Sequence, residues 1–186
     1  MVVAQRVLTL EEFLCLPERK PALEYEDGVI TQKVSPKGRH SALQDELMER
    51  FNAVGKRHRR ARAFPELRVT FAGRSYVPDV AVYRWDRIPL TPDGEIVDDF
   101  ATPPDITVEI VSPKQSVTAL MRRCLWYVAN GVKVSLLVDP GDRSVLIVRP
   151  GGGVQVVRGE GTIDVSDALA GFQLTAAELF ASLKLA

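Results

Sequence analysis

The sequence has little cysteine, little histidine and no net charge. Its 186 residues include 2 Cys and 2 His, and 24 Lys plus Arg balance 24 Asp plus Glu. Cys15 and Cys124 lie far apart and match no metal-binding or redox spacing, so we expect buried thiols in a reducing compartment. A chain without net charge has no polybasic coat, so any contact with nucleic acid must come from a local patch.

Long apolar runs and internal repeats are also missing. No apolar stretch approaches the ~18 residues of a membrane span, and the first residues, MVVAQRVL, lack the apolar core of a signal peptide. We therefore expect a cytoplasmic protein with no membrane partner. A chain of this length buries about two thirds of its unfolded surface, so it needs no disulfide or structural metal to fold.

The hydrophobic pattern predicts short helices and strands in alternation. Thr9 is the expected cap of a helix over residues 9–16, and Asp27-Gly28 is the expected turn of a hairpin over residues 23–34. Further helices are predicted over residues 40–54, 116–130 and 175–183, and further strands over residues 66–71, 75–84, 106–111, 133–139, 144–149 and 154–158. Residues 85–104 hold four prolines and predict a long loop.

This order of elements predicts an α/β fold. The helix between the strands at 106–111 and 133–139 implies a crossover between parallel strands, and apolar residues on both sides of the strands imply a sheet covered on both faces. We expect a single domain over residues 1–186 with its core at about 40–140. An N-terminal helix and hairpin (9–34) and a C-terminal β appendage with a helix (141–186) complete it.

Two acidic residues stand in segments that otherwise favour burial. Asp79 lies in VPDVAV and Glu109 in ITVEIV, where an unpaired carboxylate is costly. Pro78 lacks an N–H, so the strand ladder is interrupted just before Asp79. One interpretation is structural: an ion pair with a nearby Arg, or a solvated strand end. The other is a Mg²⁺ (or Mn²⁺) ion between the two carboxylates, which polarises a phosphodiester and activates a water molecule.

The order of several short motifs resembles a known family. Pro78-Asp79 is followed by Glu109-Ile110-Val111-Ser112-Pro113, by Tyr127 through Gly131-Val132, and by Leu137-Val138-Asp139-Pro140. This set resembles the Uma-type "putative restriction endonuclease" family, a branch of the PD-(D/E)XK phosphodiesterase superfamily. Leu23 through Gly28 looks like the hairpin of that family, and Arg39-His40-Ser41 looks like its Arg-His pair at a helix start.

The resemblance implies a restriction-endonuclease-like mixed sheet flanked by helices, with extra β-hairpins, and a Mg²⁺-dependent cut of DNA. It makes Asp79 and Glu109 metal ligands and the carbonyl of Ile110 a third ligand. Glu24 matches an acidic position of the family and binds metal directly or through water. His40 matches the family histidine, with a site-lining or proton-relay role.

The superfamily motif is incomplete in this chain. Its lysine belongs two residues after Glu109, where Val111 stands, and the position to which family members move it holds Arg123. Arg123 can hold a phosphate oxygen, but an arginine is a poor general base. Lys114 lies just past the strand and can reach back, although nothing in the sequence fixes its direction. Ser112 has no His or Asp partner placed by spacing, so we do not predict a nucleophile there.

The strongest local charge feature is the run Lys56, Arg57, His58, Arg59, Arg60 and Arg62. It suits the C-terminus of a helix, and it equally suits a patch that follows DNA phosphates. The lead hypothesis is a Mg²⁺-dependent DNA endonuclease, with a homodimer as a guess from the resemblance. The alternatives are a nuclease fold that only binds DNA or protein, and a metal phosphoesterase acting on small nucleotides.

Overall fold

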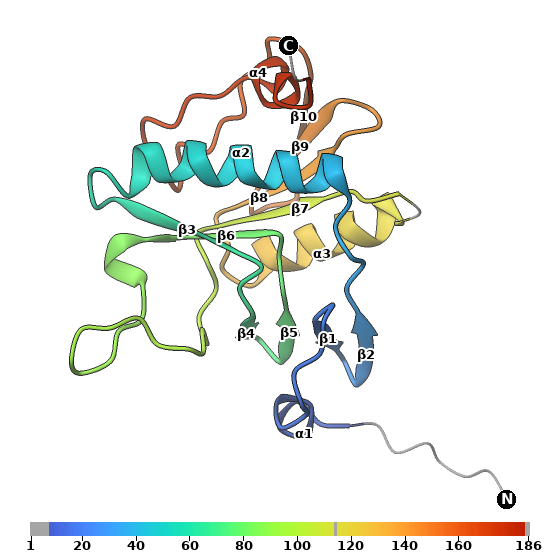
Figure 1. Cartoon of the computed structure of the whole chain (residues 1–186), viewed down its shortest axis with the longest axis vertical. Helices are drawn as coiled ribbons and strands as arrows, with labels where there is room; N and C mark the ends of the chain where they lie inside the picture. The colour runs from blue at the N-terminus through green and yellow to red at the C-terminus, as the bar shows by residue number, and fades with distance from the viewer. Residues whose placement is uncertain (1–7, 114, 185–186) are drawn as a thin grey trace, which may run out of the picture.

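The structure is a computed structural model that describes residues 8–113 and 115–184 (Figure 1). The helices of these residues are α1 (Leu10–Leu14), α2 (Gly38–Gly55), α3 (Val117–Ala129), α4 (Ala176–Ala181) and the 3-10 turn η1 (Trp85–Arg87). Their strands are β1 (Leu23–Glu26), β2 (Val29–Gln32), β3 (Ala61–Pro65), β4 (Val69–Phe71), β5 (Arg74–Tyr76), β6 (Val80–Arg84), β7 (Ile106–Ile110), β8 (Val134–Asp139), β9 (Ser144–Val148) and β10 (Val154–Val157).

The strands form two sheets. The larger has the order β10-β9-β8-β7-β6-β3, and the smaller has the order β2-β1-β5-β4. Only β7 and β8 pair in parallel, joined through α3, and the other neighbouring strands are antiparallel. In Figure 1, α2 and α4 cover one face of the larger sheet and α3 covers the other. The predicted restriction-endonuclease-like mixed sheet, flanked by helices and carrying extra hairpins, is confirmed.

Alternation along the strands separates two core layers. Successive side chains of a strand point to opposite faces. Val80 and Val108 therefore pack in one cluster with Leu47 of α2, whereas Tyr83 packs in another with Tyr127 of α3. Asp79 precedes Val80 by one position and Glu109 follows Val108 by one position, so the alternation turns both carboxylates to the α3 face. The same packing that stabilises the sheet thus brings two acidic groups to one side.

Turn and cap chemistry follows the sequence closely in the N-terminal part. Thr9 and Glu12 form the capping box of α1. In the hairpin, Asp27 and Gly28 both have positive φ, 50° and 86°, as a tight turn between twisted strands requires. The predicted helix over 116–130 is also confirmed, because Ser116 caps α3 and Gly131 follows it with φ 106°.

The predicted strand over residues 75–84 is wrong as a continuous element. It is two strands, β5 and β6, which belong to different sheets. The break covers residues 77–79, where Pro78 cannot donate to a ladder. Asp79 therefore precedes β6 and does not lie within it. The strand β3, which contains Arg62 of the basic run, is absent from the prediction because its sequence ARAFP has little β-branched content.

Among the described residues, no helix has both the length and the apolar character to cross a membrane.

Candidate active site

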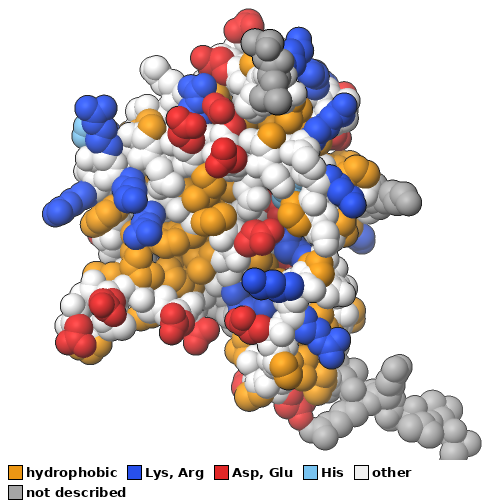
Figure 2. Space-filling view, in the orientation of Figure 1, with side chains coloured by type: hydrophobic (Ala, Val, Ile, Leu, Met, Phe, Trp, Pro, Cys, Tyr) orange, Lys and Arg blue, Asp and Glu red, His pale blue; other side chains and the backbone are white. Residues whose placement is uncertain are grey.

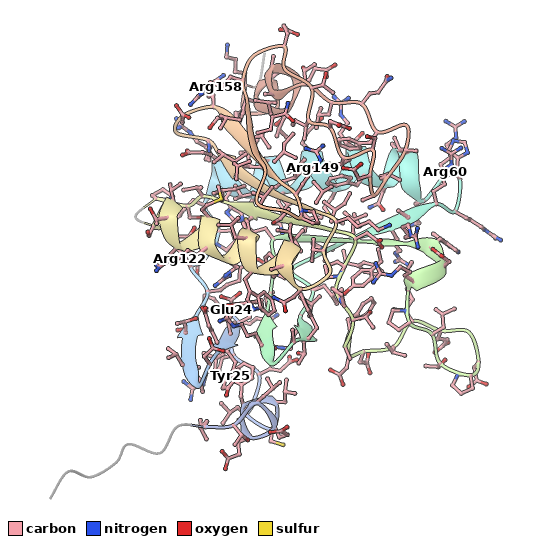
Figure 3. All side chains as sticks on the ribbon, turned by 180° about the vertical axis from the view of Figure 1, so that it is seen from behind. Glu24, Tyr25, Arg60, Arg122, Arg149 and Arg158 are labelled. Carbon is pink, nitrogen blue, oxygen red and sulfur yellow. The ribbon has the colours of Figure 1, made fainter. Side chains whose placement is uncertain are left out.

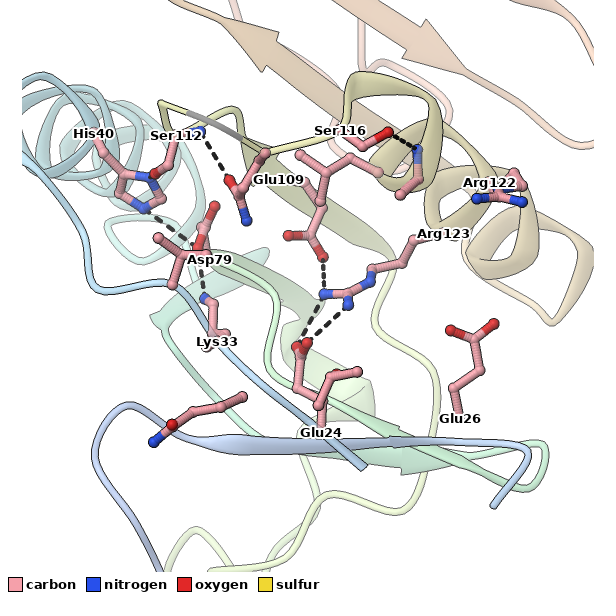
Figure 4. A pocket seen from close by; sticks show the side chains of 16 residues that line it. Glu24, Glu26, Lys33, His40, Asp79, Glu109, Ser112, Ser116, Arg122 and Arg123 are labelled. Carbon is pink, nitrogen blue, oxygen red and sulfur yellow. Dashed lines mark hydrogen bonds and ion pairs between the residues drawn. The ribbon is translucent and has the colours of Figure 1, made fainter. Parts of the chain in front are cut away.

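Asp79 and Glu109 meet at the junction of the two sheets. The antiparallel pair Val80 and Val108 sets the register, and one further position places Asp79 opposite Glu109. Each residue is only 2% exposed. Both line a pocket of about 470 Å³ that β1, β2 and α3 also line (Figure 4). The two unusual carboxylates predicted from the sequence therefore share one cavity.

Donors from three parts of the chain surround the carboxylate of Asp79. Lys33 places its Nζ 2.5 Å from Oδ1, and His40 places its Nε2 3.3 Å from the same oxygen. The backbone N–H of Ile110 donates to Oδ2 at 2.7 Å. Burial acts to raise the pKa of Asp79, but His40 and Lys33 outweigh burial and hold it below its ordinary value. Asp79 is therefore a carboxylate that stays ionised.

Glu109 and Glu24 share a single guanidinium. Arg123 makes a two-pronged contact with Glu24, at 2.9 and 2.7 Å, and lies 3.6 Å from Oε1 of Glu109. Glu24 also accepts from the N–H of Val77 at 3.0 Å. Glu109 accepts from the hydroxyl of Tyr127 at 2.9 Å. Figure 4 shows Arg123 between the two glutamates, and the structure ties the N-terminal hairpin to α3 through this contact.

The charges in the pocket are unevenly compensated. Burial raises the pKa of Glu109 to about 7, Arg123 and Lys33 oppose the rise, and Asp79 and Glu24 add to it. The pKa of Lys33 lies above its ordinary value, because Asp79 and Glu109 outweigh the effect of burial. Glu109 is thus the acid whose negative charge lacks sufficient compensation, while Lys33 and Arg123 stay positive.

His40 and Ser112 add a further hydrogen bond beside Asp79. His40 is 5% exposed and its Nδ1 lies 3.0 Å from the hydroxyl of Ser112. When the hydroxyl donates to Nδ1, the other ring nitrogen, Nε2, carries the hydrogen that faces Asp79. Sequence spacing gave Ser112 no partner, but the fold brings His40 and Asp79 to it. Ser112 belongs to the site as the group that orients His40.

The donor set of the pocket suits a hard divalent cation. Of the four acids that line the pocket, the three buried ones, Glu24, Asp79 and Glu109, offer oxygen ligands, which Mg²⁺ and Mn²⁺ prefer. Glu109 also has the pKa expected of a carboxylate beside too few cations. Within residues 8–113 and 115–184, no three His, Cys, Asp or Glu side chains are arranged to hold a metal ion. The pocket therefore suits a metal ion that two carboxylates hold, with water or phosphate oxygens as its remaining ligands.

The predicted site residues do not all reach the pocket. Glu24, His40, Asp79, Glu109 and Arg123 line it, whereas Ile110 contributes its N–H to Asp79 and is not among the lining residues. Lys114 lies outside the described residues.

The basic run lies away from the pocket. It follows α2, whose 18 residues span about 27 Å, and His40 is at the other end of that helix. Figure 3 shows Arg60 far from Glu24 and Arg122. In Figure 2, the Lys and Arg side chains beyond the end of α2 stand on the opposite side of the molecule from the N-terminal hairpin. A role in DNA binding stays a prediction for this run.

Sequence reasoning missed Lys33 and gave Tyr127 a place in the family motif but no role in the site. Lys33 directly follows β2, and nothing in the pattern VITQKV distinguishes it from a solvated lysine at a strand end. Its side chain is 10% exposed because the small sheet folds over the pocket. The only sequence signal for either residue is its position next to a motif. Tyr127, for example, lies four positions after Arg123.

Comparisons with known proteins agree with this fold and site. The model of the family Uma2, described as "Putative restriction endonuclease", matches residues 10–177. A crystal structure from Anabaena variabilis ATCC 29413, described as a "putative nuclease belonging to DUF820", is similar to this chain with a TM-score of 0.92 and 41% identity. The match covers 95% of this chain and 99% of that one. Among curated proteins, none matches.

The mixed sheet and its acidic pocket define a restriction-endonuclease-like protein. The chain belongs to the Uma2 family, since the family model covers most of its length and the similar structure is a close relative over nearly all of it.

Proposed function

We propose that this protein is a metal-dependent DNA endonuclease that hydrolyses phosphodiester bonds. The observation that carries the proposal is the meeting of Asp79 and Glu109 across β6 and β7, in a pocket that Lys33 and Arg123 also line. Two carboxylates of this kind can hold a divalent cation, and two buried cations can contact a phosphate. The descriptions of the family and of the Anabaena structure as nuclease-like give the same class of reaction.

Asp79 and Glu109 would hold Mg²⁺ or Mn²⁺, with water or phosphate oxygens as the remaining ligands; the carbonyl of Ile110 stays a prediction, since Ile110 does not line the pocket. When bound, such an ion supplies charge stabilisation to the phosphodiester and lowers the pKa of water. Metal binding also explains why the fold keeps Glu109 buried, since a nearby dication favours the ionised carboxylate and removes the cost that raises its pKa.

The remaining residues act on the substrate and on the metal ligands. Glu24 holds the guanidinium of Arg123 in place through both of its oxygens, and the remaining N–H groups of that guanidinium would contact the phosphate. Arg123 does not serve as the base: burial acts to lower its pKa, but Glu109 and Glu24 outweigh burial and keep the pKa above its ordinary value. His40 orients Asp79 through Nε2 and is the group able to carry a proton at the pocket wall.

DNA is the proposed substrate, with its backbone contacted by Lys56, Arg57, Arg59, Arg60 and Arg62 beyond the end of α2. Helix α2, which is about 27 Å long, separates this run from the pocket. That length corresponds to about eight base pairs of duplex. Cutting both strands of a duplex needs two pockets, so a homodimer belongs to the same proposal.

A plasmid-nicking assay with Mn²⁺ tests the activity. The wild-type protein should convert supercoiled plasmid to the open circle, and Asp79→Asn should reduce the rate about 100-fold or more. Asp105→Asn is the matched control, because Asp105 is also buried among cations, at 1% exposure, but does not line the pocket. Equal rates for wild type and Asp79→Asn would refute the proposal.

The second candidate function is a binding module that keeps the fold without cleaving. It is favoured by the observation that Glu24 and Asp79 already have cationic partners in the pocket. In addition, Arg123 stands at the position where the resemblance to the family implies a lysine. Arg123→Lys separates the two functions. If the wild type binds duplex DNA without nicking it and Arg123→Lys creates nicking, the natural protein is the binding module.

A further inference from the structure

The position of Lys33 conflicts with metal binding at Asp79. The ammonium nitrogen lies 2.5 Å from Oδ1 of Asp79, close to the distance at which that oxygen would bind a metal ion. Oδ2 of Asp79 is already turned to the N–H of Ile110. A dication and an ammonium cannot occupy the same side of one carboxylate, because they repel strongly at such distances. One of them must leave.

Of the two cations that are largely buried in the pocket, Lys33 and Arg123, Lys33 is the one that can be displaced. Arg123 is held by both oxygens of Glu24, and Glu24 is fixed in turn by the N–H of Val77. The acidic partner closest to Lys33 is Asp79, to which a dashed line runs in Figure 4. A divalent ion between Asp79 and Glu109 therefore leaves the Arg123–Glu24 contact intact and takes the place of the lysine.

The structure also provides a second acid for the displaced ammonium. Oε1 of Glu66 lies 4.0 Å from Nζ of Lys33. The backbone N–H of Glu66 donates to the carbonyl of Asp79 at 3.2 Å, which keeps the two acids as neighbours. The backbone of Lys33 is held by a 2.9 Å hydrogen bond from its N–H to the carbonyl of Ala22. Only the flexible side chain needs to move, from a buried acid to one that is 49% exposed.

We propose that Lys33 is an exchangeable counter-ion of Asp79, which a divalent metal ion displaces toward Glu66. Lys33 compensates the charge of Asp79 before the metal binds and pairs with Glu66 afterwards. The N-terminal hairpin is then part of the metal site, and not an appendage to it. This inference rests on the proposed function, because it requires a divalent ion at Asp79 and Glu109.

Calorimetric titration of Mn²⁺ into the full chain, without DNA, tests the proposal. Lys33→Met keeps the length of the side chain and removes the competing charge, so it should bind Mn²⁺ about tenfold or more tightly than the wild type. Lys133→Met is the matched control, since Lys133 lies 3.6 Å from another buried acid, Asp105, and does not line the pocket. The control should leave the dissociation constant within about twofold of wild type.

Glu66→Gln provides a second test with a half-exposed residue whose replacement leaves the core intact. Removing the receiving acid should weaken Mn²⁺ binding about threefold or more when Lys33 is present, and by less than about twofold in the Lys33→Met background. This dependence distinguishes a partner of Lys33 from a remote charge.

The outcomes separate the inference from the proposed function. If the wild type binds Mn²⁺, Asp79→Asn abolishes binding, and Lys33→Met binds no more tightly than wild type, the counter-ion role is refuted while the metal site stands. Equal effects of Glu66→Gln in both backgrounds also refute it. If neither the wild type nor Lys33→Met binds Mn²⁺, the metal site and the counter-ion role fail together.

Discussion

The buried carboxylate of Glu109 makes the stability of the metal-free protein fall as the pH rises. Burial, with help from Asp79 and Glu24, raises the pKa of Glu109 from 4.5 to about 7. Between these values the folded chain holds a proton that the unfolded chain has released, so the free energy of unfolding decreases with pH in this window. The full loss is about 3 kcal/mol, or about 6–12 °C in melting temperature for a chain of this size.

The change that tests this reasoning is Glu109→Gln, which keeps the shape and removes the titration. We expect the difference in melting temperature between variant and wild type to grow from near zero at pH 5 to its full size at pH 8, in metal-free buffer. Glu178→Gln is the control: the hydrogen bond from the backbone of Thr175 lowers the pKa of Glu178, so its effect lies below this pH range. If the difference in melting temperature between Glu109→Gln and wild type is constant or shrinks as the pH rises, Glu109 is ionised throughout this range and the argument is refuted.

Three further predictions concern the same framework. Tyr127→Phe removes the hydroxyl that donates to Glu109 at 2.9 Å, and should cost about 1–3 kcal/mol in denaturant unfolding; no measurable change would mean that the bond does not form. Gly55→Ala should destabilise the fold by a similar amount, about 1–3 kcal/mol, because the new Cβ would lie 2.7 Å from the carbonyl oxygen of Ala61. The control is Gly38→Ala, whose new Cβ meets nothing within 4 Å and should be tolerated. The expectation of two buried thiols is wrong for Cys15, which is exposed, whereas Cys124 is buried and burial raises its pKa to about 12. Ellman's reagent should therefore modify one thiol quickly in the native protein and none in Cys15→Ser; two fast thiols would contradict the packing of α3.

The parts of the fold that depend on local signals were predictable from the sequence. The Asp27-Gly28 turn, the Thr9 cap and the helix ending before Gly131 each depend on one or two residues with a strong conformational preference. The separation of β5 from β6 was not predictable in the same way. Pro78 signals an interruption, but only the packing of two sheets decides that the chain changes sheets there.

The acidic half of the site was likewise visible in the sequence, and the cationic half was only partly so. Asp79 and Glu109 stand out because carboxylates are rare in buried strands, and their shared sheet follows from adjacent elements. Lys33 carries no such signal, since a lysine after a strand is ordinary at a solvated edge. Its burial depends on how the N-terminal hairpin closes over the larger sheet, which is a contact between segments 46 residues apart. The hydrogen bond between Ser112 and His40 joins residues 72 apart for the same reason.

The central claim is that Asp79 and Glu109 hold one divalent ion. A crystal soaked in Mn²⁺ and measured at the manganese absorption edge tests it directly. The account predicts one anomalous peak at about 2.0–2.3 Å from an oxygen of each carboxylate, with the ammonium of Lys33 moved off Asp79 and the Arg123–Glu24 contact retained. Crystals that show no peak in the pocket at saturating Mn²⁺, with Lys33 still against Asp79, would contradict it.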